Sequence, residues 1–127
     1  PYFYSPERYR DSVAKINRYA LEQGRDMSGF QWACYSHVAI YPTLEEAVDV
    51  AAQDLGGRYQ HGRDFNDIAR DYCVLGSVQQ CIARIQEYVD AGARHIVFSV
   101  SGPREDRVRH IETIAKEIIP HFQRGPG

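Results

Sequence analysis

The sequence has no long apolar run and no block of charge of one sign. No stretch approaches the roughly 18 apolar residues that a membrane-spanning helix needs, so no membrane segment is predicted. The 15 Lys and Arg residues are intermixed with 17 Asp and Glu residues, for a net charge of −2, which argues against a nucleic-acid partner. The first ten residues lack a basic segment followed by an apolar one, so no signal peptide is expected.

Cysteine is scarce and its spacing is irregular. Cys34, Cys73 and Cys81 are an odd set with no close pair, which argues against a disulfide scaffold or a four-cysteine zinc site. We expect three buried thiols in a reducing, cytoplasmic setting. The histidines lack the spacing of metal ligands, and no P-loop, G-x-G-x-x-G or G-x-S-x-G motif is present, so no metal is predicted.

Well-marked helix starts are present instead. Ser5-Pro6 is a typical cap and first helical position, and Thr43 with Glu46 and Ser77 with Gln80 have the pattern of capping boxes. With the apolar periodicity, these signals predict helices over residues 6–23, 44–55, 65–72, 78–91 and 103–119. Gly56-Gly57 is expected to end the second helix and Pro120 the last. The last helix should turn five apolar residues inward: Val108, Ile111, Ile114, Ala115 and Ile118.

Two segments have the composition of strands buried on both faces. Trp32–Tyr41 would place Tyr35, His37 and Tyr41 on one face and Cys34 and Val38 on the other. The second segment is His95–Val100. Because long helical connections separate these strands, the sequence predicts a parallel pair.

The second half of the chain carries a motif of recognisable type. The stretch "CVLGSVQQCIARIQEYVDAGARHIVFSV", followed by "RHIETIAKEIIPHF", resembles the C-terminal end of a luciferase-like monooxygenase, a superfamily of flavin- or deazaflavin-dependent oxidoreductases. The matching features are a glycine-serine turn at Gly76-Ser77, a helix with its end at Cys81–Ile85 and Tyr88–Gly92, a final strand at Arg94–Val100 and a last helix at Ile111–Pro120. "SPERYRDSVAKINRYALEQGRD" is similar to the helix that follows the sixth strand in that family.

The resemblance implies a (β/α)8 TIM barrel, of which this chain is a C-terminal fragment. Residues 1–127 would form a single partial α/β domain with two or three parallel strands and four to five helices. Pro1–Tyr4 would be the exit of a third strand. In the family, much of the cofactor contact and many catalytic groups come from strands that match nothing here, so no catalytic residue is assigned.

The family's cofactor, FMN or a deazaflavin, and a small-molecule substrate are implied as well. Two outcomes stay open for the isolated chain: it binds this cofactor, or it binds none. Likewise, the chain is either a partial oxidoreductase that is incomplete by itself or a non-catalytic α/β oligomeric or binding module. Because two or three strands cannot close a barrel, we expect a homodimer or association with the missing barrel portion.

Chemistry in such barrels lies at the carboxyl ends of the strands. Ser101, Gly102 and Arg104 follow the second strand there and are a candidate anion site for the cofactor; the alternative is a plain strand-to-helix turn. A candidate ligand pocket comprises four residues of the two strands: Tyr35, His37, Tyr41 and Ser99. The alternative for these residues is interior packing with satisfied polar groups.

Overall fold

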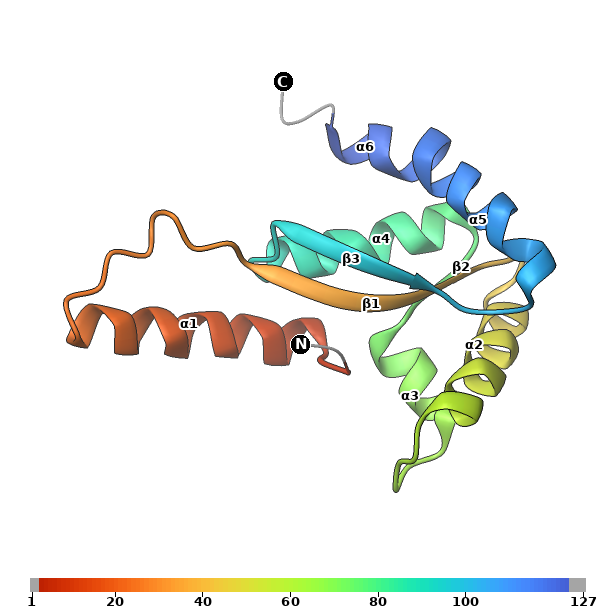
Figure 1. Ribbon diagram of the computed structural model, residues 1–127, viewed down its shortest axis with the longest axis horizontal. Coiled ribbons are helices and arrows are strands. Elements are labelled where there is room, and N and C mark those ends of the chain that lie inside the picture. The colour runs from red at the N-terminus through yellow and green to blue at the C-terminus, as the bar shows by residue number, and fades with distance from the viewer. Residues whose placement is uncertain (1–2, 124–127) are drawn as a thin grey trace.

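The computed structural model describes residues 3–123 and contains a three-stranded parallel sheet with helices packed on both faces (Figure 1). In chain order the elements are α1 (Pro6–Glu22), β1 (Ala33–Ile40), α2 (Leu44–Arg58), α3 (Phe65–Tyr72), β2 (Val74–Gly76), α4 (Val78–Asp90), β3 (His95–Val100), η1 (Arg104–Asp106), α5 (Arg107–Thr113), η2 (Ile114–Ile118) and α6 (Ile119–Gln123).

The sheet has the order β2-β1-β3, with β1 in the centre. Ala33 of β1 pairs with His95, and the parallel register continues to Val38 and Val100, which confirms the predicted pair. The third strand is β2, which pairs with the last three residues of β1. With three residues, β2 is too short to show any periodicity in the sequence.

The prediction of a strand exit at Pro1–Tyr4 is wrong for Phe3 and Tyr4, which do not belong to a strand. Pro1 and Tyr2 lie outside the described residues.

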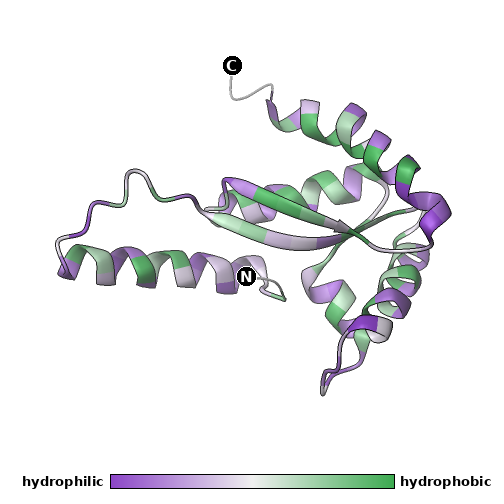
Figure 2. Cartoon of the chain, viewed as in Figure 1, coloured by the Kyte–Doolittle hydropathy of each residue, from purple (hydrophilic) through white to green (hydrophobic). Residues whose placement is uncertain are grey.

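The two faces of β1 are covered by different helices. Val38 and Ile40 pack with α4 and η2, in a cluster that includes Ile85 and Ile118. Ala39 and Tyr41 point the opposite way and pack with the apolar residues of α2 and α3. We call the face of Val38 and Ile40 the outer face and the face of Ala39 and Tyr41 the inner face. Figure 2 shows largely hydrophobic strands and helices on which hydrophobic and hydrophilic residues alternate.

The second helix runs past its predicted end. It continues through Gly56 and Gly57 to Arg58, and the Tyr59 amide still donates to the Leu55 carbonyl at 2.9 Å. Arg58 forms an ion pair with Asp54 one turn earlier, at 3.2 Å. An ion pair at this spacing helps a helix to continue, and glycine weakens a helix without breaking it.

The last helix also differs from its prediction. It continues through Pro120 to Gln123, because the turn before the proline is widened, with the Ile119 amide donating to the Ile114 carbonyl five residues earlier. Ile114 and Ile118 are buried as expected, but Val108 and Ile111 are 64% and 54% exposed, and Ala115 is exposed too. His110 is buried on the same side of the last helix as Ile114 and Ile118. Because it is polar, the search for apolar periodicity did not include it.

Figure 1 shows α2, α3 and α5 gathered at the end of the sheet to which the strands point, with α1 extending from the other end. Tyr9 of α1 holds this helix to the sheet by donating its hydroxyl to the Ala33 carbonyl at 2.9 Å. The three cysteines are buried and free.

Candidate functional site

The inner face brings two predicted ligand residues together at the carboxyl end of the sheet. His37 of β1 and Ser99 of β3 are partners in the parallel register, so their side chains lie next to each other on one face. Tyr35 lies one step earlier on this face and contacts the His37 ring edge-on, at 5.4 Å between centroids. These three of the four predicted pocket residues therefore form one cluster.

The imidazole of His37 is the most unusual polar group of this cluster. The residue is only 2% exposed, yet neither ring nitrogen has a hydrogen-bond partner among residues 3–123. Burial lowers the pKa of His37, the nearby charge of Arg58 lowers it further, and Asp54 opposes the shift. His37 is therefore neutral, with one nitrogen free to donate and the other free to accept. Buried polar groups in proteins are nearly always paired, so the imidazole is available to a partner from outside the described residues.

Arg58 brings a positive charge to the same cluster. Its guanidinium donates to the Ser99 hydroxyl at 3.4 Å, from the last turn of α2 across to β3. The other side of the guanidinium pairs with Asp54 at 3.2 Å, a contact without hydrogen-bond geometry. Arg58 therefore links the end of α2 to β3 beside the cluster.

Tyr41, the fourth predicted pocket residue, is engaged elsewhere. Its hydroxyl donates to the Asp106 carboxylate at 2.8 Å, and the Arg109 guanidinium lies over its ring, 5.0 Å from the centroid. Burial and then the Asp106 carboxylate raise the pKa of Tyr41 to about 12. The hydroxyl therefore stays protonated and ties the end of β1 to the segment after β3.

His110 completes this tie and differs sharply from His37. It is fully buried, and its Nε2 accepts the Ile40 amide at 2.8 Å while its Nδ1 lies 2.8 Å from the Asp106 carbonyl. This pairing requires a neutral ring protonated on Nδ1, in agreement with a pKa that burial lowers. The Arg109 side chain donates to the Ile40 carbonyl at 3.0 Å. Two side chains of α5 therefore pair with the backbone of Ile40, which lies beyond the last residue of β1 that pairs with β3.

The predicted anion site, Ser101-Gly102-Arg104, has mixed features. Ser101 is fully buried and its hydroxyl lacks a partner among the described residues. Gly102 has a φ of 115°, and a Cβ there would lie 2.8 Å from the Tyr41 hydroxyl and 2.9 Å from a Val50 methyl group, so packing alone requires glycine. Arg104 is exposed and is followed directly by Glu105 and Asp106. Anion binding at these residues stays a prediction.

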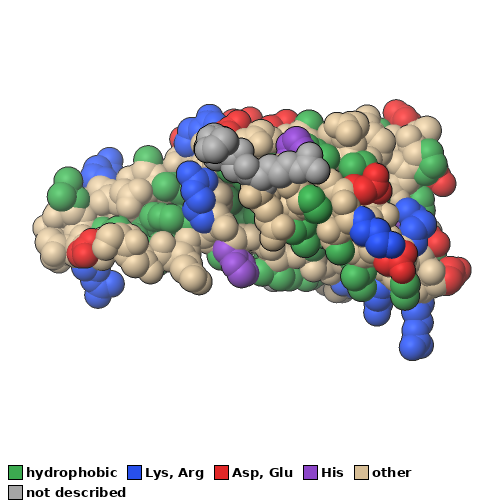
Figure 3. All heavy atoms as spheres, turned by 90° about the horizontal axis from the view of Figure 1, so that it is seen from above, with side chains coloured by type: hydrophobic (Ala, Val, Ile, Leu, Met, Phe, Trp, Pro, Cys, Tyr) green, Lys and Arg blue, Asp and Glu red, His purple; other side chains and the backbone are tan. Residues whose placement is uncertain are grey.

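The charge distribution at this end of the molecule is also mixed. Figure 3 shows acidic and basic side chains side by side at the end where η1 and α5 lie, rather than a basic patch. A shallow hollow beside Gly102 and Pro103 is lined by Asp54, Val50 and Gln53. A carboxylate in this hollow disfavours a phosphate there.

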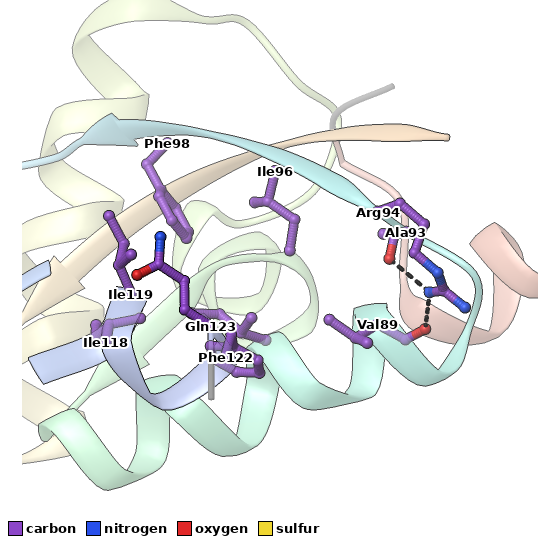
Figure 4. A pocket seen from close by; sticks show the side chains of 10 residues that line it. Val89, Ala93, Arg94, Ile96, Phe98, Ile118, Ile119, Phe122 and Gln123 are labelled. Carbon is purple, nitrogen blue, oxygen red and sulfur yellow. Dashed lines mark hydrogen bonds between the residues drawn. The ribbon is translucent and has the colours of Figure 1, made fainter. Parts of the chain in front are cut away.

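An apolar groove opens on the outer face, away from the inner-face cluster. Figure 4 shows Ile96 and Phe98 of β3 pointing into it from one side and Phe122 of α6 from the other. Arg94 borders the groove and is held by the Val89 and Ala93 carbonyls, each at 2.8 Å. Among the described residues, no His, Asp, Glu, Cys, Ser or Tyr lines the groove, so it is not the candidate site.

Neither a metal centre nor a membrane span emerges from the described part of the chain. Within residues 3–123, no three His, Cys, Asp or Glu side chains lie together in a way that could hold a metal ion. No helix of the same range is both long and apolar enough to cross a membrane.

Sequence reasoning missed Arg58, Asp54 and Phe3 as members of the cluster. Asp54 and Arg58 have helical ion-pair spacing, a signal that places them on one face of a helix but not beside Ser99. Phe3 stacks on His37 with ring centroids 5.8 Å apart. No sequence signal links these two residues, which are far apart in the chain.

Among the comparisons with known proteins, the one with solved structures gives matches. No protein-family model matches the chain, and no curated protein sequence matches it either. Among solved structures, the chain is similar to an F420-dependent secondary alcohol dehydrogenase in complex with an F420-acetone adduct, with a TM-score of 0.69 and 19% identity over 92% of this chain and 40% of the other. It is also similar to a coenzyme F420-dependent tetrahydromethanopterin reductase from Methanopyrus kandleri, with a TM-score of 0.65 and 21% identity over 93% of this chain and 43% of the other.

The chain thus spans about two fifths of the length of these solved structures. At this level of identity the likeness concerns the fold, and it confirms the predicted fold class, part of a parallel α/β barrel. The resemblance inferred from the sequence is confirmed at the level of the fold: the chain has the fold of part of a (β/α)8 barrel.

Proposed function

We propose that this chain is part of a flavin- or deazaflavin-dependent oxidoreductase and that its inner face forms one wall of the cofactor and substrate cavity. The observation that carries the proposal is the buried imidazole of His37, unpartnered within residues 3–123, at the carboxyl end of the sheet. Support comes from the fold, since both solved structures to which the chain is similar are described as F420-dependent.

The inner-face residues fit the ring of such a cofactor. A flavin or deazaflavin ring is flat and carries hydrogen-bond donors and acceptors along its edge; when bound it supplies hydride chemistry. Tyr35 offers an aromatic wall, and neutral His37 offers one donor and one acceptor. Arg58 lies close enough to His37 to lower its pKa, so it would also stabilise negative charge on a ring held there.

The same residues fit a phosphate tail less well. Arg104 is the cation of the predicted anion site, but Glu105 and Asp106 follow it, and Asp54 lines the hollow beside Gly102. We therefore assign the ring to the inner face of this chain and leave the phosphate to Ser101, Gly102 and Arg104 only as a secondary proposal.

The proposal includes a partner for the uncovered apolar surface. Val97 on the inner face of β3 is 43% exposed, and β3 is an edge strand of the described sheet. Several helix and loop residues are similarly exposed: Ile16, Leu21, Phe30, Val108, Ile111 and Ile119. A second copy of the chain, or the rest of a barrel, would cover Val97 and the open edge of β3. Sedimentation over a concentration series should give a dimer of the isolated chain; a species near 14.5 kDa at all concentrations contradicts the dimer.

A reducing, cytoplasmic location belongs to the same proposal. Burial raises the pKa of the Cys73 and Cys81 thiols to about 12, so neither is a reactive thiolate at neutral pH. Three buried free thiols are typical of a protein that is not exposed to oxidising conditions.

A binding titration tests the function. The purified chain is titrated with coenzyme F420 and, separately, with FMN, and ligand fluorescence is followed. We expect saturable binding of one of them, weakened about tenfold by His37→Phe because the hydrogen bonds of the imidazole are lost. The matched control is His95→Phe, a change at the opposite end of β3, which should leave the affinity unchanged. No saturable binding, or equal affinities of the two variants, would overturn the proposal.

A further inference from the structure

The last helix carries apolar side chains on a side that the described fold leaves uncovered. α5, η2 and α6 follow one another without a break and form this helix. Val108, Ile111 and Ile119 are 64%, 54% and 41% exposed, and Ala115 is exposed too. We call these four residues the exposed stripe. Figure 3, which looks onto the side of the molecule where the last helix lies, shows hydrophobic side chains at the surface among charged ones.

The spacing of the exposed stripe keeps its members together on the helix surface. Its second member follows the first by three positions, and the third and fourth each follow by four. Residues three and four apart are neighbours on a helix surface. A different side of the same helix carries His110, Ile114 and Ile118, which are buried. The helix is therefore apolar on two sides, and a contiguous apolar surface in water is typical of a site for protein–protein contact.

Two opposite charges border the exposed stripe one helical turn apart. The charged atoms of Glu112 and Lys116 lie 4.0 Å apart, and the side chains are 60% and 75% exposed. An exposed ion pair of this length contributes little to the stability of one chain. Both side chains therefore keep most of their surface for charges outside the helix.

We propose that the exposed stripe is a two-fold interface, on which the last helices of two copies of this chain pair antiparallel. The stripe is self-complementary, as a two-fold interface requires. With the axis beside Thr113, Val108 lies against Ile119 of the partner subunit, and Ile111 lies against Ala115 of the partner subunit. All four members of the stripe are then covered in both copies.

The bordering charges select the antiparallel direction. With the same axis, Glu112 faces Lys116 of the partner subunit, and Lys116 faces the partner's Glu112. Parallel pairing would place each charge beside its own counterpart, and like charges across an interface repel. Antiparallel helices also bring the positive end of one helix dipole to the negative end of the other. Apolar contact and charge pairing thus favour the same arrangement.

The exposed stripe is continuous with the apolar groove of the outer face. Ile119 lines that groove together with Ile118 and Phe122 (Figure 4). A partner helix that covers Ile119 therefore also covers the border of the groove. Val97, on the inner face of β3, does not belong to this surface. The inference goes beyond the proposed function and does not depend on cofactor binding.

An exchange of charge between the two copies tests the pairing. Sedimentation over a concentration series at low salt gives the dimer dissociation constants of the unmodified chain, of Glu112→Lys and of Lys116→Glu. Each substitution places like charges opposite each other at two positions of the interface, so each should weaken the dimer about tenfold. An equimolar mixture of the two variants should associate as tightly as the unmodified chain, because the mixed dimer pairs opposite charges at both positions.

A substitution in the stripe itself has a matched control on another helix. Ile111→Glu places a carboxylate in the middle of the interface and should leave the chain monomeric at concentrations at which the unmodified chain is a dimer. Leu21→Glu changes a residue of α1 that is 79% exposed and should leave the dissociation constant unchanged. A dimer that is lost in Val97→Glu but retained in Ile111→Glu would assign the contact to β3 and reject the stripe.

Three other outcomes would overturn the inference. The unmodified chain would be a single species near 14.5 kDa at all concentrations, which would leave the stripe to a partner other than a second copy. Glu112→Lys would associate as tightly as the unmodified chain, or the mixture would associate no better than either variant alone. The ligand titration fails or succeeds separately: a dimer that responds to charge exchange without binding F420 or FMN would sustain the interface and reject the function.

Discussion

Two buried histidines at the same end of the sheet differ in how their nitrogens are used. His37 is 2% exposed and His110 fully buried, and burial is the leading cause of a lowered pKa for both. Both nitrogens of His110 have backbone partners, at the Ile40 amide and the Asp106 carbonyl. Neither nitrogen of His37 has a partner among residues 3–123.

The difference separates a structural role from a binding role. The bonds of His110 join α5 to the end of β1, so its polarity contributes to the fold. The polarity of His37 contributes no hydrogen bond to the described structure and instead carries an unsatisfied desolvation cost. We infer that His110 holds the loop after β3 in place, while His37 is kept for a ligand.

The largest expected effect is on stability at His110. His110→Phe leaves the buried Ile40 amide without its acceptor, and a buried donor left unpaired costs about 1–3 kcal/mol. We expect a loss near the upper end of this range in the free energy of urea unfolding. His95→Phe, at an exposed position, is the control and should change stability by less than about 0.5 kcal/mol. Equal effects of the two variants would mean that the His110 contacts do not stabilise the fold.

The pH dependence of stability should follow the same contacts. Because the folded-state pKa of His110 is lowered, the folded protein binds fewer protons than the unfolded chain as pH falls. Stability is then complete above the ordinary histidine pKa of about 6.5 and declines below it, by up to about 1.4 kcal/mol per pH unit, until the folded pKa is reached.

Urea unfolding between pH 7.5 and pH 5 measures this decline. His37 adds a decline of the same sign, since its pKa is also lowered. In His110→Phe, the fall of the free energy of unfolding with decreasing pH should therefore be less steep but should not disappear. A slope that is unaffected by this substitution would show that other groups control the acid sensitivity.

The smallest expected effect on stability is at His37. His37→Phe removes two nitrogens that have no partners and keeps a flat ring against Phe3 and Tyr59. Removal of an unpaired buried polar group can be neutral or stabilising, so the free energy of unfolding should change by no more than about 1 kcal/mol. A loss comparable to that of His110→Phe would instead assign His37 a structural role.

The sequence predicted β1 and β3 and the shared face of Tyr35 and His37, but not the difference between the histidines. Alternation along Trp32–Tyr41 placed Tyr35 and His37 together, since side chains of a strand point to opposite faces in turn. Capping signals at Ser5, Thr43 and Ser77 located three helix starts, and each of these side chains does accept the expected amide.

What the sequence did not predict depends on contacts between distant segments. The three residues of β2 form a strand only because the end of β1 offers an edge to pair with. His110 replaces an apolar residue on the buried ridge of the last helix because the Ile40 amide and the Asp106 carbonyl lie within its reach. The stacking of Phe3 on His37 and its contact with Tyr72 likewise join segments that are far apart in the chain. None of these pairings leaves a periodic signal in the sequence.

The central claim, that His37 is a ligand-binding residue and His110 a structural one, is tested most directly by NMR of the histidine ring nitrogens. Ring-labelled protein is recorded at neutral pH with and without a saturating concentration of FMN or coenzyme F420, whichever the titration shows to bind. We predict that the His110 resonances show a neutral ring protonated on Nδ1 in both states, whereas those of His37 shift on addition of the ligand. Unchanged His37 resonances at saturation, or a shift confined to His110, would contradict the account.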